Sequence, residues 1–408
     1  MAVTTVFANT EFRRLFAAAA VSGLGTSVGY LAMPLVAITA LHAGPGEVGA
    51  LGALATVAFL LVGLPAGAWT DRVRRRGVLV AADLARAVLF ASVPLAWWLD
   101  LLTMAQLYIV VTVSGTCTVF FDVASQSYLP RLVGRESLVA ANARLVAMET
   151  VNDIAGRGLG GYLVALVSAP VAILLDAASY AVSALCVLRV RHREPVPARP
   201  VGRKLGREVA DGVRFVFGHV LLRPLLVTGT IANLAVAMVT TMLPVLFVRD
   251  LGRTAAELGL FLAAGGLGAF TGSMLARRLA DRFGSGRTVC LGNVCTAPLA
   301  FALPFLDGGI SLPLTGLAWF GMTVSAGVNN VLAVSFRQRA TPEELLGRMN
   351  ATFRFLLTGA LAVGAAVAGV VGELADPRAV LWVGAAIFAL AWVPVVCSPL
   401  RTTRDLPE

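Results

Sequence analysis

Charged residues are scarce in this chain of 408 residues. Only 14% of the residues are charged and 58% are apolar, whereas a soluble domain has roughly 25% charged and about 45 to 50% apolar residues. The mean hydropathy is +0.82. This balance excludes an ordinary soluble domain and indicates that lipid is the main solvent of the folded chain.

Histidine and cysteine are also few, and a nucleotide-binding loop is lacking. The three histidines lie outside the long apolar runs, so a histidine proton relay inside a membrane is not expected. The five cysteines form no CxxC pair and no cluster with histidine, so the sequence predicts neither a disulfide framework nor a metal site. No GxxxxGK[ST] loop occurs. Pumping by this chain alone would therefore draw on an ion gradient rather than on a bound cofactor.

The net charge of +10 could suggest binding to nucleic acid. The 33 basic residues, however, occur in short bursts between apolar runs rather than on one amphipathic face. Such bursts are typical of loops between membrane spans, so we expect a lipid bilayer as the partner and no nucleic acid.

Twelve apolar runs approach the roughly 20 residues that a membrane helix needs. The first run is too long for the h-region of a cleavable signal, which is about 7 to 15 residues, so we expect it to stay as an uncleaved span. The runs cover residues 15–41, 48–70, 77–99, 105–128, 141–166, 170–190, 224–248, 256–279, 288–306, 311–335, 351–373 and 379–398.

Positive charge alternates from loop to loop. With the N-terminus inside, 27 of the 33 basic residues fall in cytoplasmic segments or at the cytoplasmic ends of the runs, and the outer loops hold only Arg249, Arg253 and Arg378. Short loops rich in Arg and Lys face the cytoplasm. We therefore predict an all-α, multi-pass protein of the inner (plasma) membrane with twelve transmembrane helices and both termini cytoplasmic.

The longest polar stretch divides the chain into two halves. It begins with three prolines, typical of an extended linker, and continues as an amphipathic segment from Leu205 to Phe217. We expect that segment to form a helix on the cytoplasmic membrane surface. The predicted organisation is an N-terminal six-helix bundle at 1–190, a cytoplasmic linker at 191–223 and a C-terminal six-helix bundle at 224–408.

Internal repetition supports this division. An Asp-Arg pair follows span 2 and another follows span 8, with Asp71 and Asp281 separated by 210 residues. A second anchor, Asn142 before span 5 and Asn350 before span 11, has a separation of 208 residues. Two motifs that recur at nearly the same separation indicate that the two halves are structural repeats, as in many secondary transporters.

Several motifs resemble those of a known family. LADRFG (Leu279–Gly284) and GAWTDRVRRR (Gly67–Arg76) resemble the loop motif of the major facilitator superfamily. RQRATPEELLGRMNA, DLARA and LLDAASYAVSAL resemble its macrolide-efflux and enterobactin-exporter-like branch. The resemblance implies the major facilitator fold and transport by alternating access.

In that family the loop motif steadies the outward-facing state. The resemblance therefore implies a conformational gating role for Gly67, Asp71, Arg72, Asp281, Arg282 and Gly284. Trp69, Arg74 and Arg277 depart from the family pattern. The alternative is that the arginines of these loops only set the topology.

Span 5 carries three charged residues on one helical face. Glu149, Asp153 and Arg157 are spaced i, i+4 and i+8, and charges at that depth are costly unless they face an aqueous cavity. We expect Glu149 and Asp153 to carry protons and Arg157 to pair with them or to anchor an anionic substrate. The alternative is an Asp153–Arg157 pair that only stabilises the bundle.

Further polar residues within spans are candidates for the same cavity, although each alone can be ordinary packing: Asp122, Gln126, Thr26, Tyr30 and Asn233. GRGLGG (Gly156–Gly161) resembles the antiporter motif of span 5, with Arg157 in place of its proline, and Gly156 and Gly160 suit close helix packing. Asp83, Arg86 and Asp176 match family positions near span ends, where a structural role is expected.

These observations favour a proton-coupled exporter of a drug-like or secondary-metabolite small molecule. The resemblance implies an antiporter connected with antibiotic resistance, with protons and a small molecule as partners, and we expect a monomer. A siderophore exporter and an uptake permease stay open, as does a non-transporting membrane receptor or scaffold. The sequence has no group of residues typical of a metal site or of an activated nucleophile, so the chain is not expected to be an enzyme.

Overall fold

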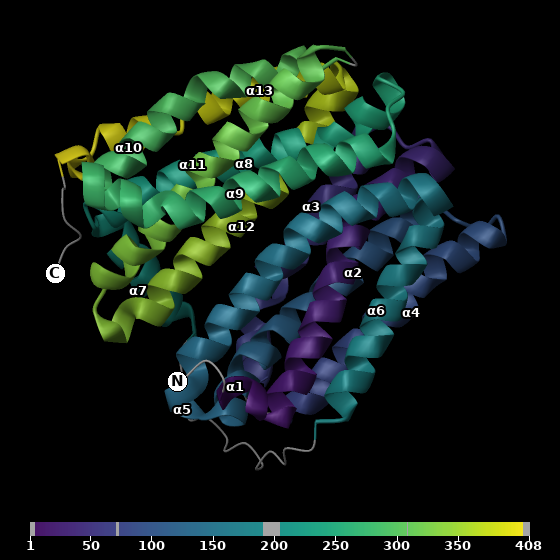
Figure 1. Ribbon diagram of the computed structural model, residues 1–408, viewed down its shortest axis with the longest axis horizontal. Helices are drawn as coiled ribbons and strands as arrows, with labels where there is room; N and C mark the ends of the chain where they lie inside the picture. The colour runs from purple at the N-terminus through teal and green to yellow at the C-terminus, as the bar shows by residue number, and fades with distance from the viewer. Residues whose placement is uncertain (1–4, 71–72, 191–204, 308, 403–408) are drawn as a thin grey trace. The chain divides into compact units, whose positions relative to one another are not determined.

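The computed structural model describes residues 5–70, 73–190, 205–307 and 309–402, and every regular element within these ranges is a helix (Figure 1). A helix satisfies all of its interior backbone N–H and C=O groups without water, which is what lipid demands of a spanning segment. The predicted all-α membrane fold is confirmed.

Two compact units divide the chain. The first consists of Met1–Ala43, Leu54–Val201 and Thr254–Ala263, and the second of Gly44–Ala53, Gly202–Arg253 and Ala264–Glu408. The predicted domain boundaries near residues 190 and 223 stay a prediction.

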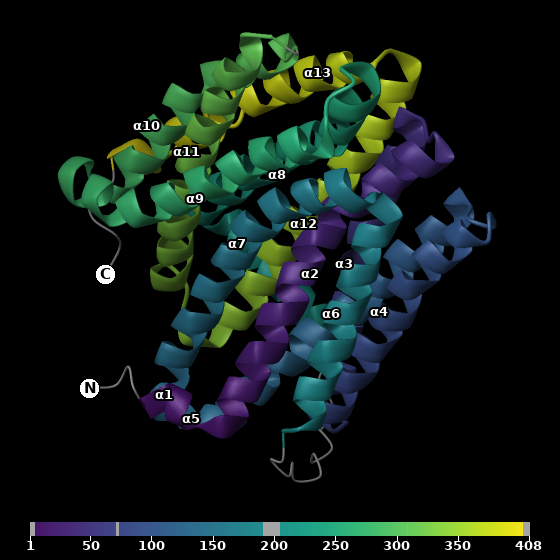
Figure 2. The ribbon, with the colours of Figure 1, turned by 45° about the vertical axis from the view of Figure 1, so that its right-hand side comes forward.

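The first unit holds α1 to α6, with the start of α3 assigned to the second unit. Helix α2 packs against α5 and α6, and α4 packs against the same two helices, an arrangement visible in both ribbon views (Figure 2). The helices are α1 (Thr5–Ala8), α2 (Thr10–Leu41), α3 (Pro45–Thr70), α4 (Arg75–Trp98), α5 (Met104–Val167) and α6 (Ala169–Leu188).

The second unit holds the remaining helices, except that the start of α9 is assigned to the first unit. Helix α8 packs against α12 and α13. The elements are α7 (Leu205–Gly218), α8 (Leu222–Pro244), its π-helical continuation η1 (Val245–Asp250), α9 (Ala255–Phe283), α10 (Ser285–Thr296), the 3₁₀ helix η2 (Ala297–Phe305), α11 (Ser311–Arg339), α12 (Glu343–Leu374), α13 (Pro377–Ala389), α14 (Val393–Val396) and η3 (Pro399–Thr402).

Helix α5 is two arms joined at one glycine. Gly134 has φ 73° and ψ 164°, which breaks the helical path inside the range Met104–Val167. Glycine reaches this region of backbone conformation without a Cβ clash, unlike other residues. The first arm contains the predicted span 4 and the second arm contains the predicted span 5.

Eleven helices in the described part of the chain are long and apolar enough to cross a membrane. The predicted fifth span, 141–166, is helical but is not among these eleven. It carries Arg144, Glu149, Asp153 and Arg157 in one run, and this charge is the physical reason for its low apolar content.

Each unit has its own apolar core. The core of the first unit gathers around Phe12 and Tyr128, which are 0% exposed, with contributions from α2, α4, α5 and α6. The core of the second gathers around Phe336 and Phe353. Close helix contacts in the first unit use small residues, because a Cβ at Gly156 would lie 2.4 Å from Cβ of Ser27 and one at Gly160 would lie 3.1 Å from Cα of Val28. The packing role predicted for these two glycines is confirmed.

The predicted amphipathic helix of the linker is present as α7. It packs against α12, where Asp211 accepts a 3.2 Å bond from Nη1 of Arg348 and a Cβ at Gly212 would lie 2.7 Å from the Arg348 carbonyl oxygen. Its position at the membrane surface stays a prediction, and residues 191–204 lie outside the described part of the chain.

Candidate functional site

The predicted stripe on the second arm of α5 contains one ion pair. Nε of Arg157 lies 2.8 Å from Oδ1 of Asp153, and the two side chains are 24% and 47% exposed. The guanidinium carbon of Arg157 also lies 5.3 Å from the ring centroid of Tyr30 on α2. Two candidates from distant parts of the sequence, Tyr30 and Arg157, therefore meet, and the cation of this pair already neutralises Asp153.

Glu149 stands apart from that pair. It is exposed, and its carboxylate lies within electrostatic reach of Asp122 on the other arm of α5. Gln126, one turn after Asp122, is exposed as well. The four charged candidates on α5 thus form two pairs. Asp153 and Arg157 form a neutral pair, and Glu149 and Asp122 form an acidic pair.

Thr26 belongs to a different cluster from Tyr30, although both lie on α2. Its hydroxyl donates to the Ser22 carbonyl at 2.8 Å and lies 2.9 Å from the hydroxyl of Tyr180, which is buried on α6. This bond connects α2 to a buried polar network inside the first unit.

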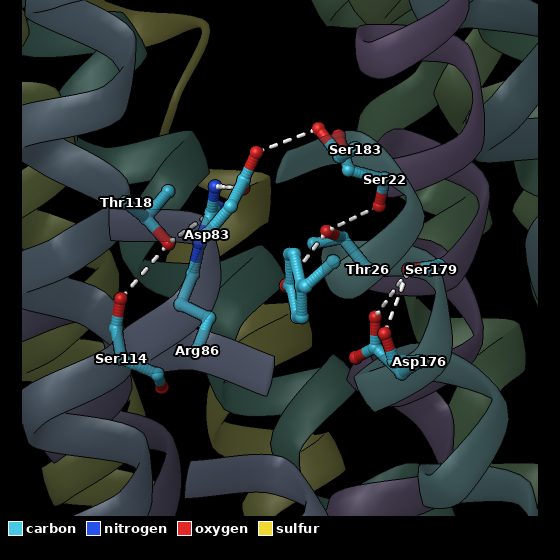
Figure 3. Close-up of polar contacts among 10 residues, drawn as sticks. Ser22, Thr26, Asp83, Arg86, Ser114, Thr118, Asp176, Ser179 and Ser183 are labelled. Atoms are coloured by element: carbon cyan, nitrogen blue, oxygen red, sulfur yellow. Dashed lines mark hydrogen bonds and ion pairs between the residues drawn. The ribbon is translucent and has the colours of Figure 1, made fainter. Parts of the chain in front are cut away.

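The centre of the network is an ion pair on α4. Arg86 donates through Nη2 to Oδ1 of Asp83 and through Nη1 to Oγ1 of Thr118 at 3.3 Å, while Ser183 donates to Oδ2 of Asp83 at 2.6 Å (Figure 3). Asp83 is 0% and Arg86 3% exposed. Both oxygens of Asp83 therefore have donors from the protein itself.

Aromatic rings enclose the guanidinium. The central carbon of Arg86 lies 4.6 Å from the ring centroid of Phe121 and 4.4 Å from that of Tyr180. Aromatic faces attract cations, most strongly where water is excluded. The α5 and α6 rings thus help to hold the one cation of this network in an apolar interior.

Asp176 on α6 is the second acid of the network and is less well satisfied. Its Oδ1 accepts a 3.3 Å bond from Oγ of Ser179, while Oδ2 is buried without a hydrogen-bond partner among the described residues. The carboxyl faces two glycines of α2, since a Cβ at Gly29 would lie 2.1 Å from Oδ2 and one at Gly25 would lie 2.6 Å from Oδ1. Only the absence of side chains at these glycines gives the carboxyl its space.

The charge of this network does not balance when every group is ionised. Asp83 and Asp176 supply two negative charges and Arg86 supplies one positive charge, and all three are at most 3% exposed. Removing an ionised carboxylate from water costs several kcal/mol unless it is paired. Binding one proton at the unpaired oxygen of Asp176 neutralises the network, so the chemistry that this arrangement supports is reversible protonation.

The sequence contained a signal for this network. DLARA and LLDAASYAVSAL place acids within apolar runs, and such acids are costly unless they are paired or functional. Their position near span ends suggested a structural role, whereas the fold brings α4 and α6 together and buries them completely.

The predicted gating loops are only partly visible. Asp71 and Arg72 lie outside the described residues, while Gly67 lies in the last turn of α3. In the second copy Asp281 is 73% exposed, with Nε of Arg277 3.9 Å away.

The two remaining gating positions lie at the end of α9 and the start of α10. The guanidinium carbon of Arg282 is 5.4 Å from the ring centroid of Phe283, and Gly284 has φ 89° where it precedes α10. A positive φ explains the glycine at that position. The gating role of both loops stays a prediction.

Asn233, the candidate on α8, lines a cavity of about 180 Å³ within the second unit. Its amide donates to the Leu357 carbonyl at 3.1 Å. Asn293, Asn329 and Arg337 line the same cavity. Across the described residues, no three His, Cys, Asp or Glu side chains are grouped closely enough to hold a metal ion.

Comparison with known proteins identifies the family. The family model described as Major Facilitator Superfamily matches residues 15–358 and 231–407. The chain is 27% identical over 403 residues to the enterobactin exporter EntS of Salmonella choleraesuis, covering 97% of this chain and 94% of that protein. It is also 27% identical over 406 residues to the multidrug efflux pump Tap of Mycolicibacterium fortuitum, covering 95% and 96%.

Solved structures share the fold at low sequence identity. The nucleoside transporter NupG superposes with a TM-score of 0.76 at 12% identity, covering 95% of this chain and 98% of that one. A bacterial homologue of the iron transporter ferroportin gives 0.74 at 17% identity, covering 94% and 98%. The chain is a multi-pass inner-membrane protein and a transporter rather than an enzyme, and it belongs to the Major Facilitator Superfamily.

Proposed function

We propose that this transporter exports a drug-like or secondary-metabolite small molecule in exchange for protons, by alternating access of its two halves. The observation that carries the proposal is the network of Asp83, Arg86 and Asp176, which holds two buried acids and one cation. A proton is the simplest charge that such a site can gain and lose during a transport cycle.

Asp176 is the proposed proton carrier. Asp83 already has Arg86 and Ser183 as donors, and Asp153 has Arg157, so neither acid needs a proton for neutrality. One buried oxygen of Asp176 has no hydrogen-bond partner among the described residues. The acidic pair of Glu149 and Asp122 is the second candidate, because the two carboxylates lie within electrostatic reach of each other.

Export rather than uptake is supported by relatives whose names describe an enterobactin exporter and a multidrug efflux pump. An efflux-deficient bacterial host that expresses the chain would test this direction. We expect higher minimal inhibitory concentrations for at least one compound in a panel of macrolides, tetracyclines and dyes. An uptake permease would instead lower the inhibitory concentration of its substrate. Restored secretion of a catecholate siderophore, with unchanged drug susceptibility, would favour a siderophore exporter.

Two variants give this experiment its internal control. Asp176→Asn should abolish the protection while the protein is still made and inserted, because the amide keeps the shape of the carboxyl but cannot carry the proton. Asp100→Asn changes an exposed acid just after α4 and should leave protection intact. Full protection by the Asp176 variant would remove Asp176 from the mechanism.

A further inference from the structure

The cavity of the second unit has a composition that the proton-coupling network does not explain. It lies between α8, α10, α11, α12 and α13 and has a volume of about 180 Å³. Its lining includes four asparagines from three helices, namely Asn233, Asn293, Asn329 and Asn330. Amides inside a membrane bundle are costly unless they bond to something.

The lining is basic as well as polar. Arg337, near the end of α11, is its one charged residue, and no Asp or Glu is among the described residues that line it. The guanidinium carbon lies 4.6 Å from the ring centroid of Phe353. Its Nε is buried without a hydrogen-bond partner, and the described residues supply no ion pair to it. A cation in this position therefore attracts an anion that the described residues do not provide.

Arg86 and Arg337 differ in their partners. Arg86 in the first unit is held by Asp83, Thr118 and two aromatic faces. Among the described residues, the aromatic face of Phe353 is the one partner that Arg337 has. The second unit thus contains a cation whose counter-charge is missing from the described part of the fold.

The amides define the rest of the ligand. Oδ1 of Asn329 is buried, and no described residue donates a hydrogen bond to it, so it can accept one from an O–H or N–H group of a ligand. Asn329 and Arg337 are eight residues apart on α11, or about 12 Å of helical rise, and both line the cavity. Long helical side chains lean toward the N-terminus, which shortens the gap between the guanidinium of Arg337 and the amide of Asn329. A ligand that carries an anionic group at one end and a donor at the other suits this spacing.

The size and the apolar walls limit the ligand further. A cavity of about 150 Å³ is known to hold benzene in another protein, and this cavity is about 180 Å³. Phe353, Leu357 and Phe388 supply apolar walls. We propose that this cavity binds an organic anion of single-ring size, either a whole molecule or the anionic end of a larger substrate, with its charge on Arg337. Identifying it as a substrate subsite rests on the proposed export function.

Equilibrium binding of 4-hydroxybenzoate to the full-length protein tests the proposal. Isothermal titration in nanodiscs of zwitterionic lipid and chloride-free buffer avoids competing anions. We expect one site per chain and at least about tenfold weaker binding of 4-hydroxybenzamide, its neutral analogue, because the charge-assisted bond to Arg337 is lost. Equal binding of the acid and the amide, or no binding of the acid at all, would overturn the proposal.

Matched variants assign the binding to the cavity. Arg337→Gln should weaken binding of the acid at least about tenfold, and Arg339→Gln, an exposed arginine two residues later, should leave it unchanged. Equal losses in the two variants would show a general effect of surface charge and refute the site.

A second variant serves if Arg337→Gln does not fold. Asn329→Leu should abolish the preference for 4-hydroxybenzoate over benzoate, which lacks the hydroxyl donor, and an unchanged preference would count against the site. None of these measurements needs an energised membrane. Failure of proton-driven export would therefore leave their outcome intact, and their failure would leave proton coupling untouched.

Discussion

Replacing Asp83 with Asn should destabilise the first unit strongly. The change leaves Arg86, which is 3% exposed, without its carboxylate, while Thr118 at 3.3 Å and the rings of Phe121 and Tyr180 stay in contact. Removing one partner of a buried ion pair costs about 3 to 5 kcal/mol. Asp176 can still attract the cation, so we expect a value near the lower limit, and a larger loss in the Asp83→Asn, Asp176→Asn double variant.

Equilibrium unfolding in mixed micelles with increasing dodecyl sulfate, followed by tryptophan fluorescence, measures this cost. The double variant Asp83→Asn, Arg86→Met removes both charges. Its loss of unfolding free energy should be smaller than the summed losses of the two single variants, by a coupling energy of roughly 1 to 3 kcal/mol.

The pair of Glu11 and Arg14 is a matched control, since it has the same i, i+3 spacing but side chains that are 26% and 30% exposed. Glu11→Gln should cost below about 1 kcal/mol. Equal costs for Asp83→Asn and Glu11→Gln, or strictly additive single changes, would refute the claim that Asp83 and Arg86 form a buried, coupled pair.

Three further predictions concern packing, topology and gating. Gly29→Ala should destabilise the protein by about 1 to 3 kcal/mol because its Cβ would meet Asp176. Gly77→Ala should be neutral or stabilising, because no described atom outside its own helix turn lies within 4 Å of the added Cβ. Equal effects of the two changes in unfolding titrations would contradict the crowding at Asp176. In a cysteine-free background, cysteine at position 204 should be labelled by an impermeant maleimide only in inverted vesicles and cysteine at position 44 only in intact cells, and the reverse pattern would invert the predicted topology. Asp71→Asn should lower the transport rate more than the amount of protein in the membrane, with a weaker effect for Asp281→Asn, and normal transport with both changes would leave the loops only a topological role.

Most of the fold could be predicted from the sequence, because the lengths of the apolar runs set the helices and the basic bursts mark their ends. The sequence could not predict how the charged residues of span 5 separate into two pairs. Glu149, Asp153 and Arg157 share one face of α5, but the spacing along a helix does not show that Asp122 comes within electrostatic reach of Glu149 or that Tyr30 lies beside Arg157. Those contacts depend on the break at Gly134 and on the packing of α2.

The buried network was harder to predict for the same reason. Asp83 and Ser183 are separated by 100 residues, and only the packing of α4 against α6 makes them partners. Gly25 and Gly29 in GTSVG have a clear role only once Asp176 is placed beside them. Arg337 is the first residue of the motif RQRATPEELLGRMNA, but the cavity that it lines forms only when five helices are assembled.

Proton-driven transport in inverted membrane vesicles tests the central claim most directly. Vesicles that contain the chain and a substrate from the susceptibility panel should accumulate that substrate only while a proton gradient is imposed, and a protonophore should stop the accumulation. Asp176→Asn should bind the substrate yet fail to accumulate it, while Asp100→Asn should behave like the unaltered protein. Accumulation that ignores the protonophore and follows a Na⁺ gradient, or that persists in the Asp176→Asn variant, would contradict the proposed coupling.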